Sequence, residues 1–342
     1  MNPITKSSIL SFLCLAASVA AQGPELTLRT TAKKGSSVWL LQESKQEQTI
    51  DQGGQQFDVG GTTTHTLHVT VLDVDDKGML VVETEIVRIH GAMQMGPMGE
   101  AEFDSAAPDD GDDGGDDMGG MNPSAMVKQM TKLAGKKFVA KLDSMGKATS
   151  LEGAADLLKV GGGRMGNPVN EETLKHLAEA AFGIVPEKPI AVGASWDRVE
   201  KGTGRIGASN KMKLTLAKCD DASFEITATG TVEKPADDDA AGGEEGDDPM
   251  REMMKNMTIS NGKVMGTQKV SRQDGFVIEA SNTVSMDVDI ETPMGAMQMA
   301  MKNTVSTKRT TAEAAMPKKA PAKAEPAKTG ESERTEPKSG EK

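Results

Sequence analysis

The chain has 342 residues and a formal net charge of −12, with 23 methionines, seven phenylalanines, two tryptophans and no tyrosine. The acidic balance argues against a nucleic-acid partner, since phosphate binding needs a basic surface. The two cysteines cannot supply a disulfide framework, so stability must come from a packed core. Because thioether side chains are flexible, the composition predicts a core or groove that adapts its shape.

The N-terminus is typical of a secretory signal peptide at residues 1–21. Lys6 precedes an apolar run from Ile9 to Ala17, and Val19 and Ala21 are small residues of the kind that a signal peptidase reads. The run is too short to span a bilayer of roughly 30 Å. We therefore predict cleavage near Ala21 and an exported protein, periplasmic or extracellular, that is soluble and has no transmembrane segment after cleavage.

Cleavage would also remove one of the two cysteines. Cys14 lies in the leader, which leaves Cys219 as the only cysteine of the mature chain. We expect Cys219 to be a small buried residue of a strand rather than a nucleophile.

Negative charge is concentrated in two short stretches. Residues 100–117 carry nine carboxylates and no basic residue, and residues 233–248 carry eight against a single lysine. Such segments lack the apolar residues that would offset the entropy of ordering them. We predict disordered acidic insertions at 104–121 and 235–249, and a disordered tail rich in Lys, Glu, Pro and Ala at 310–342. Neither insertion matches an EF-hand, so weak attraction of cations such as Ca²⁺ is expected rather than a specific site.

Between these stretches, apolar and polar residues alternate in the way that indicates strands with one buried face. A hairpin is predicted in the first half with its turn at 75–78, and another in the second half with its turn at 220–223. Alignment of the turns pairs a series of apolar positions: Val69 with Leu214, Val71 with Leu216, Met79 with Phe224 and Val81 with Ile226. This pairing indicates that the two halves are related.

Helices are predicted at 123–134, 154–160 and 171–182, the last with Asn170 as its N-cap. The predicted fold class is α+β and mainly antiparallel β. We expect a curved sheet or open half-barrel of about twelve strands from two related halves, with about three helices on one face. A single β-rich domain would span 22–309, with halves at about 24–160 and 185–309 and a helical link at 153–183.

A resemblance rests on several features in fixed order: Lys33–Gly35, the turn Asp75–Gly78, Phe103–Ser105, Gly135, Phe138, Gly146, Pro189, Val192, Gly193, Ser195 and Trp196. The chain resembles a family of exported bacterial proteins that is defined only as a domain of unknown function. The layout of the strands is also similar to the curved antiparallel sheet of the lipoprotein-carrier (Lol-like) fold. Neither resemblance implies catalytic residues, and a fold does not imply a function.

The candidate functional residues are methionines from two short segments in which methionine recurs at every second position, called the two methionine strings below. Met93 and Met95 of the first string would share one face of a strand, as would Met297, Met299 and Met301 of the second. We predict that these five side chains line a surface for an apolar ligand. An alternative is Cu(I) binding by Met93, Met95, Met297 and Met299, since thioethers are soft ligands. A third interpretation is that the methionines only fill the core.

Residues for catalysis are scarce. His65 and His68 would point to opposite faces of a strand, and no catalytic triad, HExxH or CxxC motif is present. The sequence favours an exported, non-catalytic β protein without a cofactor that binds an apolar small molecule, a lipid or a partner segment. The alternatives are a structural protein of the envelope with a filled core and weakly ion-binding acidic loops, and a hydrolase whose carboxylates the sequence does not reveal.

Overall fold

The computed structural model describes residues 24–96, 99–107, 130–159, 170–201, 208–234, 256–292 and 295–315. The predicted signal peptide at 1–21, most of the acidic insertion 104–121, all of the insertion 235–249 and the tail from residue 316 lie outside these ranges.

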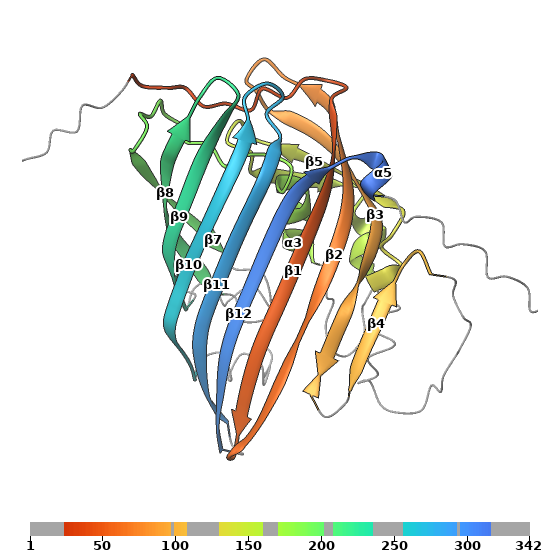
Figure 1. Ribbon diagram of the computed structural model, residues 1–342, viewed down its shortest axis with the longest axis vertical. Coiled ribbons are helices and arrows are strands. Elements are labelled where there is room, and N and C mark those ends of the chain that lie inside the picture. Colours follow the sequence, from red (N-terminus) through yellow and green to blue (C-terminus); the bar gives the residue numbers. More distant parts are fainter. Residues whose placement is uncertain are drawn as a thin grey trace, which may run out of the picture.

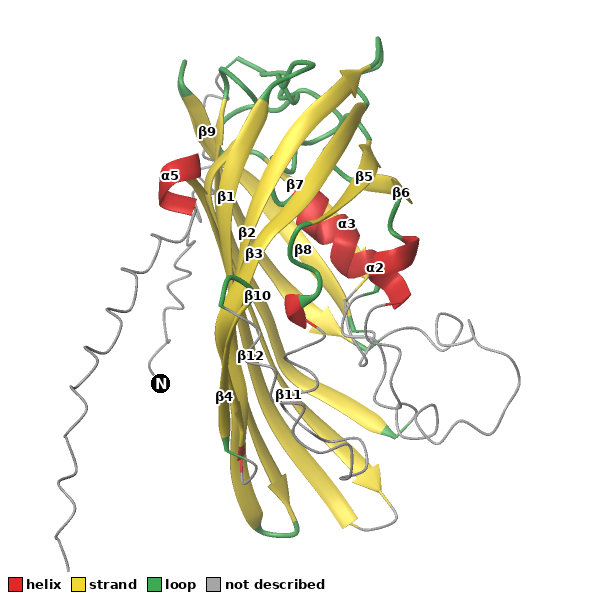
Figure 2. Ribbon diagram, turned by 90° about the vertical axis from the view of Figure 1, so that its right-hand side faces the viewer, coloured by secondary structure: helices red, strands yellow, loops and turns green. Residues whose placement is uncertain are grey.

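Twelve strands form one antiparallel sheet in the described part of the chain (Figure 1). Their order is β6-β5-β3-β2-β1-β12-β11-β10-β9-β8-β7, and β4 pairs with β3. The strands are β1 (Ser37–Gln52), β2 (Gln55–Val74), β3 (Leu80–Met95), β4 (Glu100–Asp104), β5 (Lys136–Leu142), β6 (Ala148–Glu152), β7 (Ser195–Lys201), β8 (Ser209–Cys219), β9 (Ser223–Glu233), β10 (Met257–Ser271), β11 (Val277–Thr292) and β12 (Gly295–Thr310). The sheet is curved and open, which confirms the predicted fold class (Figure 2).

Tight turns join most neighbouring strands. Gly53 and Gly54 link β1 to β2 with φ angles of 62° and 81°, values that a two-residue hairpin turn requires and that glycine adopts without strain. In the next turn the Asp75 carboxylate accepts hydrogen bonds from the backbone N–H groups of Lys77 and Met79, at 2.9 and 2.8 Å. Local side-chain chemistry therefore fixes the β2–β3 hairpin that the sequence predicts.

The two halves of the sheet repeat one order of strands. Strands β1, β2, β3, β5 and β6 follow one another across the first half, and β7 to β11 follow one another across the second in the same direction. Val69 and Val71 in β2 are buried, as are the aligned Leu214 and Leu216 in β8. Both hairpins also carry a register shift directly after the second of these positions. The shared bulge supports the prediction that the halves are related.

The predicted alignment of the return strands was wrong by one residue. Val71 pairs with Val82, whereas Leu216 pairs with Ile226, so Val82 rather than Val81 is the counterpart of Ile226. The cause is the length of the turn: residues 75–79 lie between the last pair of the first hairpin, and only 220–223 lie between the last pair of the second.

Three helices occur in the described ranges: α2 (Ala155–Lys159), α3 (Glu171–Glu179) and α5 (Ala312–Ala315). Helices α2 and α3 lie on the concave side of the sheet, and the short α5 lies on the convex side next to β1 (Figures 1 and 2). The predicted helix at 123–134 falls mostly outside the described residues, although Met130 and Thr131 are helical.

Helix α3 covers the part of the concave face that is uppermost in Figure 2. Asn170 caps it by accepting a hydrogen bond from the Thr173 backbone N–H at 2.8 Å, and its buried face carries Leu174, Leu177 and Ala178. These residues join a core formed mainly by β1, β2, β3 and β5. Full burial of a leucine contributes roughly 1.5–3 kcal/mol, so the apolar stripe fixes α3 over this half of the sheet. A second core lies against β8, β9 and β10.

An arginine joins the end of β12 to the turn between β10 and β11. Arg309 donates two hydrogen bonds to the Asp274 carboxylate, at 2.9 and 3.0 Å, and others to the carbonyls of Phe276 and Val277. At the end of β8, Cys219 is only partly buried, contrary to expectation, because it adjoins the exposed turn at Asp220.

Candidate ligand-binding face

The register shows which side chains face the concave side. Directly paired residues of an antiparallel sheet point to the same face, and successive residues alternate. Leu40 of β1 and Leu67 of β2 are paired and belong to the core under α3. Even-numbered residues of β1 and odd-numbered residues of β2 therefore face the concave side, and by pairing so do odd-numbered residues of β12 and the even-numbered residues of β11 from Ala280 onward.

Beyond the reach of α3, the concave face carries a methionine cluster. Its members are Met257, Met286, Met297, Met299 and Met301, packed with Ile259, Val288 and Ile290. They lie in rows across β10, β11 and β12: Met257 with Ile290 and Met297, Ile259 with Val288 and Met299, and Met286 with Met301. Met297, Met299 and Met301 thus share one face and are each partly buried.

The first methionine string lies apart from this cluster. Met93 of β3 pairs with Gly61, which pairs with Gln46, which in turn pairs with Asn303. Met93 packs against the core under α3 instead, and the side chain of Met95, with Met98 and Met294, falls outside the description. The structure therefore brings together Met297, Met299 and Met301 of the predicted set, but not Met93.

Two members of the cluster were not predicted. Met257 of β10 ends a separate methionine-rich run, 250–257, and Met286 of β11 stands alone in the sequence. Only their place on the alternating apolar face could have linked them to Met297, Met299 and Met301. Gln48 adds a polar contact, because its Nε2 donates to the sulfur of Met299 at 3.2 Å.

Between the core under α3 and the methionine cluster lies a polar belt. It consists of Thr63 and His65 from β2, Gln42, Ser44 and Gln46 from β1, Asn303 and Thr307 from β12, and Asn282 from β11. Gln46 and Asn303 are exposed, whereas Thr307 is buried. The belt is thus open to solvent on its methionine side and closed on its α3 side.

Two polar atoms of the belt have no partner in the described structure. His65 Nδ1 and Asn282 Oδ1 are inaccessible to solvent and make no hydrogen bond. Burial, with a smaller contribution from nearby His90, lowers the pKa of His65 from 6.5 to about 4. His65 is therefore neutral at ordinary pH.

Ionic side chains avoid this part of the concave face. From the row of His65 and Gln42 to the far ends of the strands, the concave-facing positions of β2, β1, β12 and β11 hold no Asp, Glu, Lys or Arg. The same stretches carry their charges on the convex face: Glu43, Lys45, Glu47, Asp51, Asp58, Asp287, Asp289, Glu291 and Lys302. The central concave surface is therefore apolar or neutral.

Charged groups approach the concave side at β7 and α3. His176 Nδ1 lies 3.3 Å from a carboxylate oxygen of Glu179, and the other oxygen of Glu179 accepts the Ala148 backbone N–H at 2.8 Å. Burial disfavours charged His176, but the hydrogen bond to Glu179 and the charges of Glu179 and Glu200 outweigh it and raise its pKa. Arg198 pairs with Glu200 at 2.7 Å. This network fastens α3 to β6.

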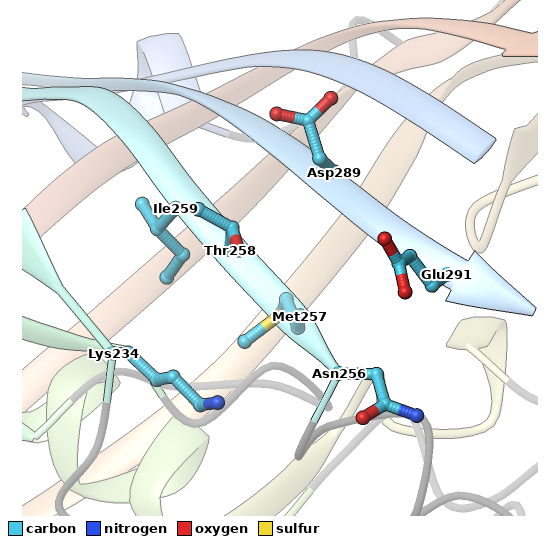
Figure 3. Close-up of a pocket in the computed structure, with 7 residues that line it drawn as sticks. All are labelled: Lys234, Asn256, Met257, Thr258, Ile259, Asp289 and Glu291. Carbon is cyan, nitrogen blue, oxygen red and sulfur yellow. The ribbon is translucent and has the colours of Figure 1, made fainter. Parts of the chain in front are cut away.

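A shallow depression of about 570 Å³ lies at the free end of β10 (Figure 3). Met257 and Ile259 contribute from the concave side, and Thr258, Asp289 and Glu291 from the convex side. Because it wraps around a strand edge, the depression touches the methionine cluster only at its margin.

The described residues contain no group of three or more His, Cys, Asp or Glu that could hold a metal ion. None of the helices within those ranges is long and apolar enough to cross a membrane.

Comparison with known proteins finds a family model that matches part of the chain, and no activity. Residues 163–277 match a family of unknown function, DUF6263, which agrees with the resemblance found in the sequence. The match runs from before α3 to the start of β11. No curated protein matches the chain.

Seven chains of solved structures match, and the three that follow are distantly similar. One is lipovitellin, described by its lipid–protein interactions, at 6% identity and a TM-score of 0.42, covering 82% of this chain and 25% of that one. Another is DynF from the dynemicin biosynthesis pathway of Micromonospora chersina, at 6% identity and a TM-score of 0.21, covering 92% and 95%. The third is an outer membrane channel from Pseudomonas putida F1, at 6% identity and a TM-score of 0.23, covering 82% and 97%. This chain spans a quarter of the lipovitellin chain, and likenesses this distant say nothing about what it binds.

Proposed function

We propose that this protein is a non-catalytic, exported binding protein that holds an apolar small molecule, such as the hydrocarbon part of a lipid, on the methionine cluster. One observation carries the proposal: five methionines gather on a concave face whose central strands, around and beyond the cluster, present no ionic side chain. A face that only covered a structural core would have no need to exclude charge from the open positions at Gln46 and Asn303.

The cluster suits a flexible chain. Met297 to Met301 extend over about 14 Å at about 3.4 Å per residue, and β10 to β12 add about 10 Å of width. Thioethers adopt several conformations at low cost, so such a surface can follow a hydrocarbon of variable shape. Each methylene group removed from water contributes about 0.8 kcal/mol before the costs of association are subtracted.

The test is binding of diphenylhexatriene, a neutral hydrocarbon fluorophore. We expect wild-type protein to bind it, and the double variant Met299→Gln, Met301→Gln to bind it at least about tenfold more weakly, because two polar amides then face the hydrocarbon. Met265→Gln is the matched control, since Met265 is 47% exposed and its partner Thr283 is an odd-numbered, convex-facing residue of β11. An equal loss of fluorophore affinity in the double variant and in Met265→Gln would refute the proposal, as would no binding by the wild type.

A further variant distinguishes apolar-ligand binding from Cu(I) binding and from a purely structural role. Replacement of all five methionines of the cluster by Leu keeps apolar volume but removes every sulfur donor of the cluster. Loss of Cu(I) in a competition assay, with unchanged fluorophore binding, would identify a copper protein. Binding of neither probe by the wild type would leave a structural role with a filled core.

A further inference from the structure

We propose that the ligand is an amphiphile with an uncharged head of several hydroxyl groups, whose head lies in the polar belt while its chain lies on the methionine cluster. This inference rests on the proposed function and names the class of ligand.

The unpartnered atoms of the belt supply the first argument. A buried polar atom without a hydrogen bond costs about 1–3 kcal/mol, and such atoms are rare in folded proteins. Five occur in the described residues, and two of them, His65 Nδ1 and Asn282 Oδ1, lie in the belt. Asn282 Oδ1 lies over Gly266 of the neighbouring strand β10, 3.2 Å from where a Cβ on that residue would be. Hydroxyl groups can satisfy both atoms, because a hydroxyl donates and accepts.

The spacing of the belt indicates the size of the head. His65 in β2 and Asn282 in β11 lie three strands apart, about 14 Å along a flat sheet at about 4.8 Å per strand, and less across a concave one. Between them, Gln42, Ser44 and Asn303 offer further donors and acceptors, with Ser44 Oγ donating to Asn303 Oδ1 at 3.3 Å. A single hydroxyl would reach one end only, whereas a sugar head can reach across.

The charge of the face excludes ionic heads. At the concave-facing belt positions of β2, β1, β12 and β11, there is no Lys or Arg to meet a phosphate or carboxylate and no Asp or Glu to meet an ammonium group. Arg309, the next residue on the same face of β12, is held by Asp274. A buried charge without a partner is far more costly than a buried hydroxyl. The belt therefore selects for a neutral head.

The belt and the cluster are continuous. Asn303 of the belt and Met301 of the cluster lie two residues apart on the same face of β12, about 7 Å along the strand. Gln46 of β1 pairs with Asn303, and Gln48 contacts Met299. One molecule can thus place its head on the belt and its chain on the methionines, with Gln46 and Asn303 exposed at the junction.

The test compares ligands that share a twelve-carbon chain, each below its critical micelle concentration, as competitors of diphenylhexatriene. Dodecyl maltoside has a neutral sugar head, dodecanoate and dodecyl phosphate are anionic, and dodecyltrimethylammonium is cationic. We expect the wild type to bind the maltoside at least about tenfold more tightly than any of the three ions, as one or two net hydrogen bonds would provide.

Variants assign that preference to the belt. His65→Phe with Asn282→Leu should remove the advantage of the maltoside and leave diphenylhexatriene binding within about twofold. His68→Phe is the matched control, because His68 lies on the opposite face of β2, where it stacks on Trp39 at 4.5 Å. Thermal melting checks that each variant is folded. The comparison of the four ligands on the wild-type protein does not depend on any variant.

The outcomes of these binding assays distinguish failure of this inference from failure of the proposed function. Equal or tighter binding of an ionic head, or no advantage of the maltoside, would overturn this inference while the proposed function stands. A preference that survives in the His65 and Asn282 variant would also overturn it. Failure of every probe, diphenylhexatriene included, would overturn the proposed function and this inference with it.

Discussion

Acid should destabilise this protein through His65. Its pKa is near 6.5 in the unfolded chain and about 4 in the folded one, because burial and nearby His90 oppose the charged ring. Protonation therefore favours the unfolded state, so the loss of stability begins as pH falls through 6.5 and is complete below about 4. The difference of about 2.5 pKa units corresponds to about 3.4 kcal/mol in full, of which about 1.8 kcal/mol appears between pH 7 and pH 5.

Urea unfolding of wild type and His65→Phe at both pH values tests this. Carboxylates titrate in the same range, so the informative quantity is the difference in unfolding free energy between the two proteins. That difference should move by about 1.8 kcal/mol in favour of the variant on going from pH 7 to pH 5. His65→Gln also removes the titration and should show the same shift. A difference that does not change with pH would refute the reasoning about His65.

Four further substitutions test the fold, each by urea unfolding at pH 7. Leu67→Ala should cost about 3 kcal/mol because the side chain is fully buried, whereas Leu72→Ala on the exposed bulge should cost under about 0.5 kcal/mol; equal costs would contradict the assigned faces of β2. Asn170→Ala should cost about 1 kcal/mol through loss of the α3 cap, and an unchanged midpoint would contradict that role. Arg309→Lys should cost up to about 1 kcal/mol, since lysine cannot make the bidentate contact with the half-exposed Asp274; a neutral result would show that the contact is not stabilising.

The hairpins could be predicted from the sequence because their causes are local. The Asp75 turn, the alternation from Leu67 to Val71 and the Asn170 cap each depend on a few neighbouring residues. Bulges are also local, but nothing in the residue pattern marks them. Both hairpins have a bulge at the aligned positions Leu72 and Ala217, so the one-residue shift of the return strands comes from the longer first turn, 75–79 against 220–223.

The candidate site depends on long-range pairing, which the sequence does not contain. The methionine cluster lies on three consecutive strands, β10 to β12. The polar belt, in contrast, exists only because the first and last strands, β1 and β12, meet at the centre of the sheet. Only this pairing shows that His65, Gln46 and Asn282 belong to one belt. The absence of ionic side chains from the central part of the concave face likewise follows only from the register of each strand.

The central claim, that an apolar ligand lies on the methionine cluster, is tested most directly by NMR of protein labelled with ¹³C at the methionine methyl groups and titrated with dodecyl maltoside. We expect saturable shifts at Met257, Met286, Met297, Met299 and Met301, with no shift at Met265 on the convex face. No change at these five methyl groups, or a larger change at Met265, would contradict it.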